Sequence, residues 1–313
     1  MYKRQGEYNT YSSGELKVAV GSDYQVSSGT VILGGKAAEI LVKDSDGKPA
    51  AGVQLYLSED DRLIGETDEN GILKTDEFNK GDLTASDYVI YAKDKDGGLS
   101  FEYKLSVFAP QGELNGLPYN VRFNTVEKLA SQKNITWFSN PLNEKKQTIK
   151  YRESGSQEWN TVDAKTQQVD FNTSGNCIVN VNAVNLEGLK ADTTYEYVLG
   201  TDETTLEAAT FKTGQEGKKT NEFFIIGDIQ DPDKSRVEEV ASQLDAKNHN
   251  YDFGITIGDA IDQASNYTDW SDLGEVLGAN MLGGTNMVNI MGNHEYYGDS
   301  SAGIASAIYN NPN

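Results

Sequence analysis

The last third of the chain alternates between short apolar runs and stretches with the spacing of an amphipathic helix. Three apolar runs, at residues 223–226, 253–257 and 287–291, are each followed by a glycine, which is typical of buried parallel strands. Between the first and second runs, apolar residues recur on one helical face: Val237, Val240, Ala241 and Leu244. Between the second and third, a similar spacing joins Trp270, Leu273, Val276 and Leu277. The pattern predicts a β-α-β-α-β order, whose right-handed crossovers bring the carboxyl ends of the strands to one edge.

Polar residues follow each of these predicted strands. Asp228 and Gln230 follow the first strand, Asp259 follows the second, and Asn293 and His294 follow the third. Ligands of open α/β sheets bind at the carboxyl edge of the strands, so we expect these side chains to converge there. Carboxylate and amide oxygens suit divalent cations, and a bridging carboxylate such as Asp259 would hold two metals about 3.5–4 Å apart.

The earlier part of the chain has the period-2 alternation of half-buried strands. Residues 36–112 contain four such runs, at 39–42, 52–57, 88–92 and 101–108. Asp-Gly or Asn-Gly phrases punctuate them, at residues 44–47, 68–71 and 94–97. We interpret these phrases as turns and not as calcium loops, because the later ligands of an EF-hand are missing. Residues 1–35, with one strand-like run at 15–20, are expected to be a tether or the remnant of a preceding module.

A second all-β module is predicted at residues 117–214. Trp137 lies in an alternating run and is expected in its core, and Tyr195 starts a strand shortly after Leu189, which is the tyrosine-corner pattern of β-sandwiches. Charged residues 215–221 are predicted to be a linker, and residues 220–313 form the α/β region. The predicted fold is therefore two β-sandwich modules followed by a partial α/β region.

The net charge, the lengths of the apolar runs and the cysteine count limit which partners and which disulfides are expected. The formal net charge of −21 repels nucleic acid and anionic membranes, so neither is an expected partner. No run approaches the ~20 apolar residues of a membrane-spanning helix, and no signal peptide opens the chain. Cys177 is the one cysteine, which excludes an intrachain disulfide; its strand-like surroundings predict a buried thiol and not a nucleophile.

The phrases that close the predicted strands resemble three motifs of the calcineurin-like metallophosphoesterases. This superfamily includes the purple acid phosphatases. The phrases are Gly227-Asp228-Ile229-Gln230, Gly258-Asp259-Ala260-Ile261-Asp262 and Gly292-Asn293-His294-Glu295. The resemblance implies that Asp228 binds one metal, Asp259 bridges two, and Asn293 binds the second. It also implies that His294 contacts the phosphoryl oxygens or protonates the leaving group.

The two β modules also resemble known domains. Residues 46–53 and 67–71 resemble bacterial immunoglobulin-like surface modules, which implies a spacer for residues 36–112. Residues 117–214 look like the fibronectin-type-III-like domain that precedes the catalytic domain of purple acid phosphatases. This arrangement implies an extracellular or cell-surface protein.

The chain departs from the superfamily pattern at three points. Gln230 stands where the pattern has histidine, and its amide oxygen is a neutral, weaker ligand. Asp262 stands where purple acid phosphatases have their metal-binding tyrosine, so a tyrosinate–ferric site is not expected. The later histidines of the family are missing, since the only histidines are His294 and His249, and His249 is interpreted as a solvated residue at a helix end. We therefore expect an N-terminal portion of the catalytic domain.

The sequence thus predicts a metal-dependent phosphoesterase, present as a fragment, that hydrolyses a phosphate ester with metal-activated hydroxide. The metals would be two ions of iron, manganese or zinc. Substrate, metal identity and oligomeric state stay open. One alternative is a surface adhesion or spacer protein with a degenerate phosphatase-like domain, which Gln230 favours. Another is a carbohydrate-binding β protein, which only the 17 tyrosines permit.

Overall fold

The computed structural model describes residues 24–28, 32–79, 83, 85–95, 100–173, 175–231, 233–246 and 251–312. The chain divides into two compact units, Met1–Pro110 and Gln111–Asn313. The strand expected at residues 15–20 and His249 lie outside the described residues, as does part of the turn phrase at 94–97. None of the helices in the described part is long and apolar enough to cross a membrane.

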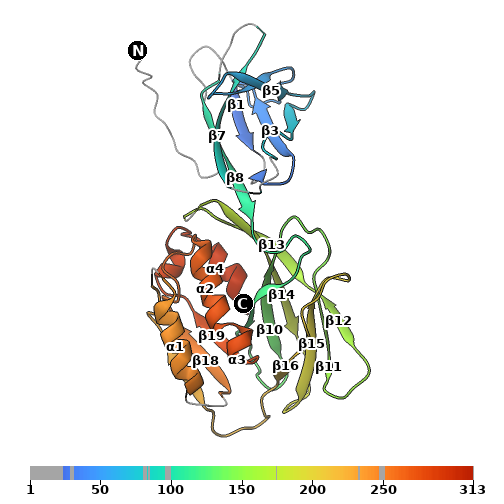
Figure 1. Cartoon of the computed structure of the whole chain (residues 1–313), viewed down its shortest axis with the longest axis vertical. Helices are drawn as coiled ribbons and strands as arrows, with labels where there is room; N and C mark the ends of the chain where they lie inside the picture. Colours follow the sequence, from blue (N-terminus) through green and yellow to red (C-terminus); the bar gives the residue numbers. More distant parts are fainter. Residues whose placement is uncertain are drawn as a thin grey trace. The chain divides into compact units, whose positions relative to one another are not determined.

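In the residues that the structure describes, the regular elements of the first unit are all strands (Figure 1). Strands β1 (Gln25–Ser28), β3 (Ala38–Lys43) and β6 (Ile72–Thr75) form one antiparallel sheet. A second sheet has the order β5 (Arg62–Glu66), β4 (Gln54–Leu57), β7 (Ser86–Lys93) and β8 (Tyr103–Pro110), with β2 (Ile32–Leu33) parallel to β8. Their apolar residues form a common core that includes Ile40, Leu55 and Ile90.

Two of the predicted turns in this unit use an aspartate to cap backbone N–H groups. The Asp44 carboxylate accepts hydrogen bonds from the backbone N–H groups of residues 46 and 48, and Asp68 accepts from residues 70 and 72. These bonds lower the pKa of Asp68. Gly47 and Gly71 close the turns with positive φ, which glycine adopts without steric cost. This geometry is that of turns, as the sequence predicts.

The second unit begins with two facing antiparallel sheets. The first contains β9 (Tyr119–Asn124), β10 (Lys133–Ser139), β14 (Cys177–Leu186) and β13 (Lys165–Phe171). The second contains β12 (Asn160–Asp163), β11 (Thr148–Glu153), β15 (Thr194–Gly200) and β16 (Ala209–Lys212). Trp137 is fully buried between them. The Tyr195 hydroxyl accepts a hydrogen bond from the Lys190 backbone N–H at 2.9 Å, which completes the predicted tyrosine corner.

Three parallel strands follow in the same unit: β17 (Phe223–Ile226), β18 (Phe253–Ile257) and β19 (Asn286–Ile290). Helix α1 (Ser235–Ala246) joins the first pair, and α2 (Tyr267–Leu277) and α3 (Ala279–Leu282) join the second. A 3₁₀ turn, η1 (His294–Tyr296), and helix α4 (Gly303–Tyr309) come last. The observed element order in this region is that expected from the apolar pattern.

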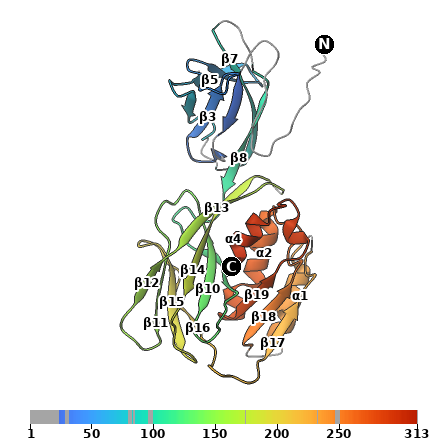
Figure 2. The same cartoon turned by 180° about the vertical axis from the view of Figure 1, so that it is seen from behind.

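The sheet that contains β10 is covered on both faces, which the sequence did not predict. All seven residues of β10 are buried. Ile135 and Trp137 face the second sheet, whereas Phe138 packs in a core with α2 and α4. Figures 1 and 2 show these helices on one side of β10 and β14, and β11 and β15 on the other. The sandwich and the α/β region therefore share a core and form one compact unit, although an exposed segment joins them.

The parallel sheet has one apolar face in solvent. Phe223, Ile225, Ile257 and Ile290 are each about half exposed. The rings of Phe223 on β17 and Phe253 on β18 stack with their centroids 5.0 Å apart. Parallel sheets are usually covered on both faces, so this face is unusual for its class.

Candidate functional site

The site expected at the carboxyl edge of the parallel sheet begins with two aspartates in a rare backbone conformation. Asp228 and Asp259, the second residues after β17 and β18, have φ values of 51° and 52°. Left-handed conformations cost free energy in residues other than glycine, and they concentrate at functional sites. Asp228 does not cap a helix, because α1 begins only at Ser235. The two turns therefore share one strained conformation at equivalent positions.

Glycines allow the turns to approach one another closely. A Cβ on Gly258 would lie 2.6 Å from the Gly292 Cα, and a Cβ on Gly292 would lie 2.7 Å from the Asp259 nitrogen. No larger residue fits at either position without displacing backbone. The glycine before Asp259 and the one before Asn293 are thus required by the packing of two neighbouring turns.

Hydrogen bonds from backbone N–H groups join all three turns. The N–H groups of Ile229 and Gln230 donate to the Asp259 carbonyl at 3.1 and 3.2 Å. The His294 N–H donates to Asp259 Oδ1 at 3.0 Å. The structure therefore brings the turns that carry Asp228, Asp259 and His294 into direct contact.

The buried carboxylate of Glu295 organises the second and third turns. Its side chain is fully buried and accepts hydrogen bonds from three backbone N–H groups. Asp259 and Gly292 donate to Oε2 at 3.0 and 2.7 Å, and Ala260 donates to Oε1 at 2.9 Å. Hydrogen bonds to an ionised acceptor are roughly twice as strong as neutral ones. Glu295 thus fixes the loop that presents Asp259.

The His294 ring is held by Asp262. Its Nδ1 lies 2.7 Å from the Asp262 carbonyl oxygen, which can only accept, so Nδ1 carries the proton. The Asp262 carboxylate lies 3.4 Å from the same nitrogen. This arrangement leaves Nε2 of the partly exposed ring available to a ligand.

The remaining predicted ligands are less completely organised. The Asp228 and Asn293 side chains are exposed, and Asn293 Nδ2 donates to the Tyr297 hydroxyl at 2.8 Å. Gln230 Oε1 is buried and has no hydrogen-bond partner. An orphaned, buried acceptor in a turn that hydrogen-bonds to the Asp259 turn fits a cation in part, because hard oxygens are the donors that such ions prefer. Within the described residues, however, no three or more His, Cys, Asp or Glu side chains gather as a metal site.

Sequence reasoning missed three residues that support this edge. Glu295 stands inside a quoted phrase, but its role depends on N–H groups 35 residues away. Arg236, on α1, donates to the carbonyls of Asp228 and Gln230 at 3.1 and 3.4 Å. The Tyr297 ring packs on the His294 ring, with their centroids 4.5 Å apart. Only the Glu295 position carried a signal, since it completes the third phrase.

One expectation outside the site needs correction. Cys177 is half-buried at the start of β14 and is not fully buried as predicted, because a strand's first residue is covered on fewer sides. Partial burial raises the pKa of its thiol. A raised pKa disfavours the thiolate, which agrees with the expectation that it is no nucleophile.

Comparison with known proteins identifies one part of the chain. Residues 118–213 match the family described as "Purple acid Phosphatase, N-terminal domain". The expected similarity of the second β module to this domain is confirmed. No curated protein matches the chain at a significant level.

Among solved structures, a structure of PhoD is similar over 60% of this chain, with 12% identity and a TM-score of 0.37. The chain spans 41% of that PhoD chain. The FN1–FN3 domains of chicken CNTN1 are similar over 65% of this chain and 67% of their own length, at 12% identity and a TM-score of 0.28. A two-domain fibronectin type-III segment from chicken tenascin matches over 61% of this chain and 98% of its own length, at 12% identity and a TM-score of 0.21. Most of the described elements are strands, and residues 118–213 are similar to the domain at the N-terminus of purple acid phosphatases.

Proposed function

We propose that this protein is a metal-dependent phosphoesterase whose metals bind at the carboxyl edge of the parallel sheet. The observation that carries the proposal is the pair of left-handed aspartates, Asp228 and Asp259, in turns that hydrogen-bond to each other. Support also comes from the preceding segment, which is similar to the purple acid phosphatase N-terminal domain.

In this proposal, the residues have distinct tasks. Asp228, Gln230, Asp259 and Asn293 would hold the metals. Bound metals would supply a hydroxide nucleophile and polarise a phosphoryl oxygen. His294, with its Nδ1–H held by the Asp262 carbonyl, would present Nε2 to a phosphate oxygen or to the leaving group.

Calorimetric titration of the chain with Mn²⁺ tests the metal site. We expect Asp259→Asn to weaken binding at least tenfold, because a charge shared by both metals is lost. Asp163→Asn is the matched control, since Asp163 is an exposed residue of β12 that pairs with Lys146. Equal Mn²⁺ affinity in the two variants would contradict the proposal.

Gln230 gives the metal site a second test. Zinc is held mostly by nitrogen and sulfur, so Gln230→His should raise zinc affinity and leave manganese affinity nearly unchanged. If neither affinity changes, Gln230 is not a ligand, and its buried oxygen needs another partner.

The other candidate is a non-catalytic spacer with a phosphatase-like region. It is favoured by the lack of any group of three or more His, Cys, Asp or Glu ligands in the described part of the chain. Under this alternative, calorimetry would detect no metal binding to the unaltered chain.

A further inference from the structure

A small, partly open cavity lies between β9, helix α2 and the parallel sheet, within the second unit. Its volume is about 40 Å³, which exceeds the space that one water molecule needs. Most of its lining is apolar, including Leu273, Leu277 and Met287. Ile229 and Ala260 also line it, so the cavity lies directly beneath the turns that carry Asp228 and Asp259.

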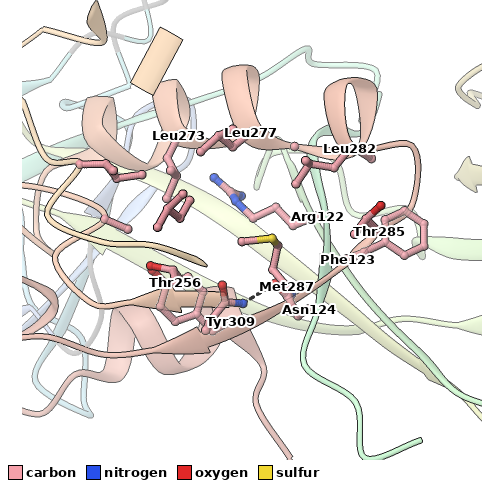
Figure 3. A pocket seen from close by; sticks show the side chains of 16 residues that line it. Arg122, Phe123, Asn124, Thr256, Leu273, Leu277, Leu282, Thr285, Met287 and Tyr309 are labelled. Carbon is pink, nitrogen blue, oxygen red and sulfur yellow. Dashed lines mark hydrogen bonds between the residues drawn. The ribbon is translucent and has the colours of Figure 1, made fainter. Parts of the chain in front are cut away.

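Three of the lining residues have buried polar atoms without a partner. They are Nε of Arg122, Oγ1 of Thr256 and the hydroxyl of Tyr309. The three residues are 7%, 3% and 2% exposed, respectively. Figure 3 shows the Arg122 guanidinium in the space between helix α2, which carries Leu273 and Leu277, and Met287. Buried polar groups are nearly always satisfied, so three orphans around one cavity indicate a bound species.

The charge of Arg122 identifies the kind of species. Its Nη1 donates to the Asn120 carbonyl at 3.1 Å, Nη2 donates to the Trp270 carbonyl, and the guanidinium lies over the Phe138 ring at 4.9 Å. Within the described residues, the polar partners of its guanidinium are carbonyl and amide oxygens, and none is a carboxylate. A buried, unpaired charge costs several kcal/mol.

The fold makes room for this cation. A Cβ on Gly274 of α2 would lie 2.3 Å from Arg122 Nη2, so a glycine is needed where the helix crosses the guanidinium. Burial lowers the pKa of Arg122 to about 10, which still leaves it protonated at neutral pH. Burial raises the pKa of the Tyr309 hydroxyl, the Glu295 carboxylate raises it further, and Arg122 lowers it.

We propose that this cavity binds a small monovalent anion of the chloride type, held by the Arg122 Nε–H and the hydroxyls of Thr256 and Tyr309. All three groups can donate, and an anion accepts from all of them while it neutralises the guanidinium. Water would satisfy hydrogen bonds but would leave the charge unbalanced. The bound anion would stabilise the contact between the sandwich and the α/β region.

Thermal unfolding measured by tryptophan fluorescence tests the proposal, because the three tryptophans (Trp137, Trp159 and Trp270) all lie in the second unit. At constant ionic strength, replacing sodium gluconate with sodium chloride should raise Tm. The expected rise is about 3–6 °C for each tenfold increase in chloride above its dissociation constant. Arg122→Met should abolish this dependence. Arg152→Met, which removes an arginine from the surface of β11, should retain it. Equal Tm values for the unaltered protein in both salts would overturn the proposal.

A direct measurement covers the case in which Arg122→Met does not fold. Crystals of the unaltered protein soaked in sodium bromide should show an anomalous peak between Arg122, Thr256 and Tyr309. Density for water alone, without an anomalous peak, would refute the anion site.

Discussion

Replacing Glu295 by glutamine isolates the contribution of its buried charge to the candidate site. The substitution keeps the size and shape of the side chain. It leaves one oxygen, which can accept from the N–H groups of Asp259 and Gly292, but it turns an NH₂ group toward the N–H of Ala260. The Ala260 N–H therefore loses its acceptor, and the N–H groups of Asp259 and Gly292 bond to a neutral oxygen in place of a charged one.

The size of the effect follows from these three bonds. A hydrogen bond to a charged group contributes about 1.5–3 kcal/mol, and a neutral bond contributes about 0.5–1.5 kcal/mol. Loss of one charged bond and weakening of two others gives about 3–5 kcal/mol. For a unit of this size, that lowers Tm by about 6–20 °C.

Urea and thermal unfolding followed by tryptophan fluorescence measure this change in the second unit alone. Glu275→Gln is the matched control, because Glu275 is exposed and forms a surface ion pair with Lys234 at 3.3 Å. Such pairs contribute about 0–1 kcal/mol. If Glu295→Gln and Glu275→Gln lower the free energy of unfolding by the same amount, Glu295 does not hold the turns together as argued.

Two further variants, one of them a double substitution, test other features of the second unit. Burial lowers the pKa of Lys133 to about 7, so between pH 7 and its ordinary pKa of 10.5 the unfolded chain binds more protons than the native one. The free energy of unfolding should therefore rise with pH above 7 by up to ~1.4 kcal/mol per pH unit from this residue. Lys133→Met should remove this rise of the unfolding free energy between pH 7 and pH 9. Lys150→Met, at an exposed position, should keep it. The same pH dependence in both variants would contradict the lowered pKa of Lys133. The second variant carries Ile225→Thr and Ile257→Thr on the exposed apolar face of the parallel sheet. It should bind less of a hydrophobic dye. Its free energy of unfolding should change by less than about 1 kcal/mol, because both side chains are already half exposed. As a control, Ile149→Thr, at a fully buried position, should lower the free energy of unfolding several times more. An equally large decrease in the double variant would show that the apolar face is covered in solution.

Local patterns in the sequence predicted most of the elements. Alternation located β3, β4, β7 and β8, and helical spacing located α1 and α2, because one covered face leaves a periodic trace. The tyrosine corner and the aspartate turns were also predicted, since their hydrogen bonds join residues only a few positions apart. The three strand-end phrases are also local, since each is a run of four or five consecutive residues.

Only the tertiary structure decided which groups meet across the second unit. Burial of β10 on both faces and the shared core of the sandwich and the α/β region depend on residues more than 100 positions apart, such as Asn124 and the Ile308 carbonyl. A sequence pattern shows that a face is apolar, but not what covers it. Arg122 and Lys133 would be assigned to the surface by their charge, yet both are buried, because helix α2 and the Gly284 carbonyl enclose them. Long-range packing, which leaves no periodic trace in the chain, creates both the cavity at Arg122 and the carboxylate clamp of Glu295.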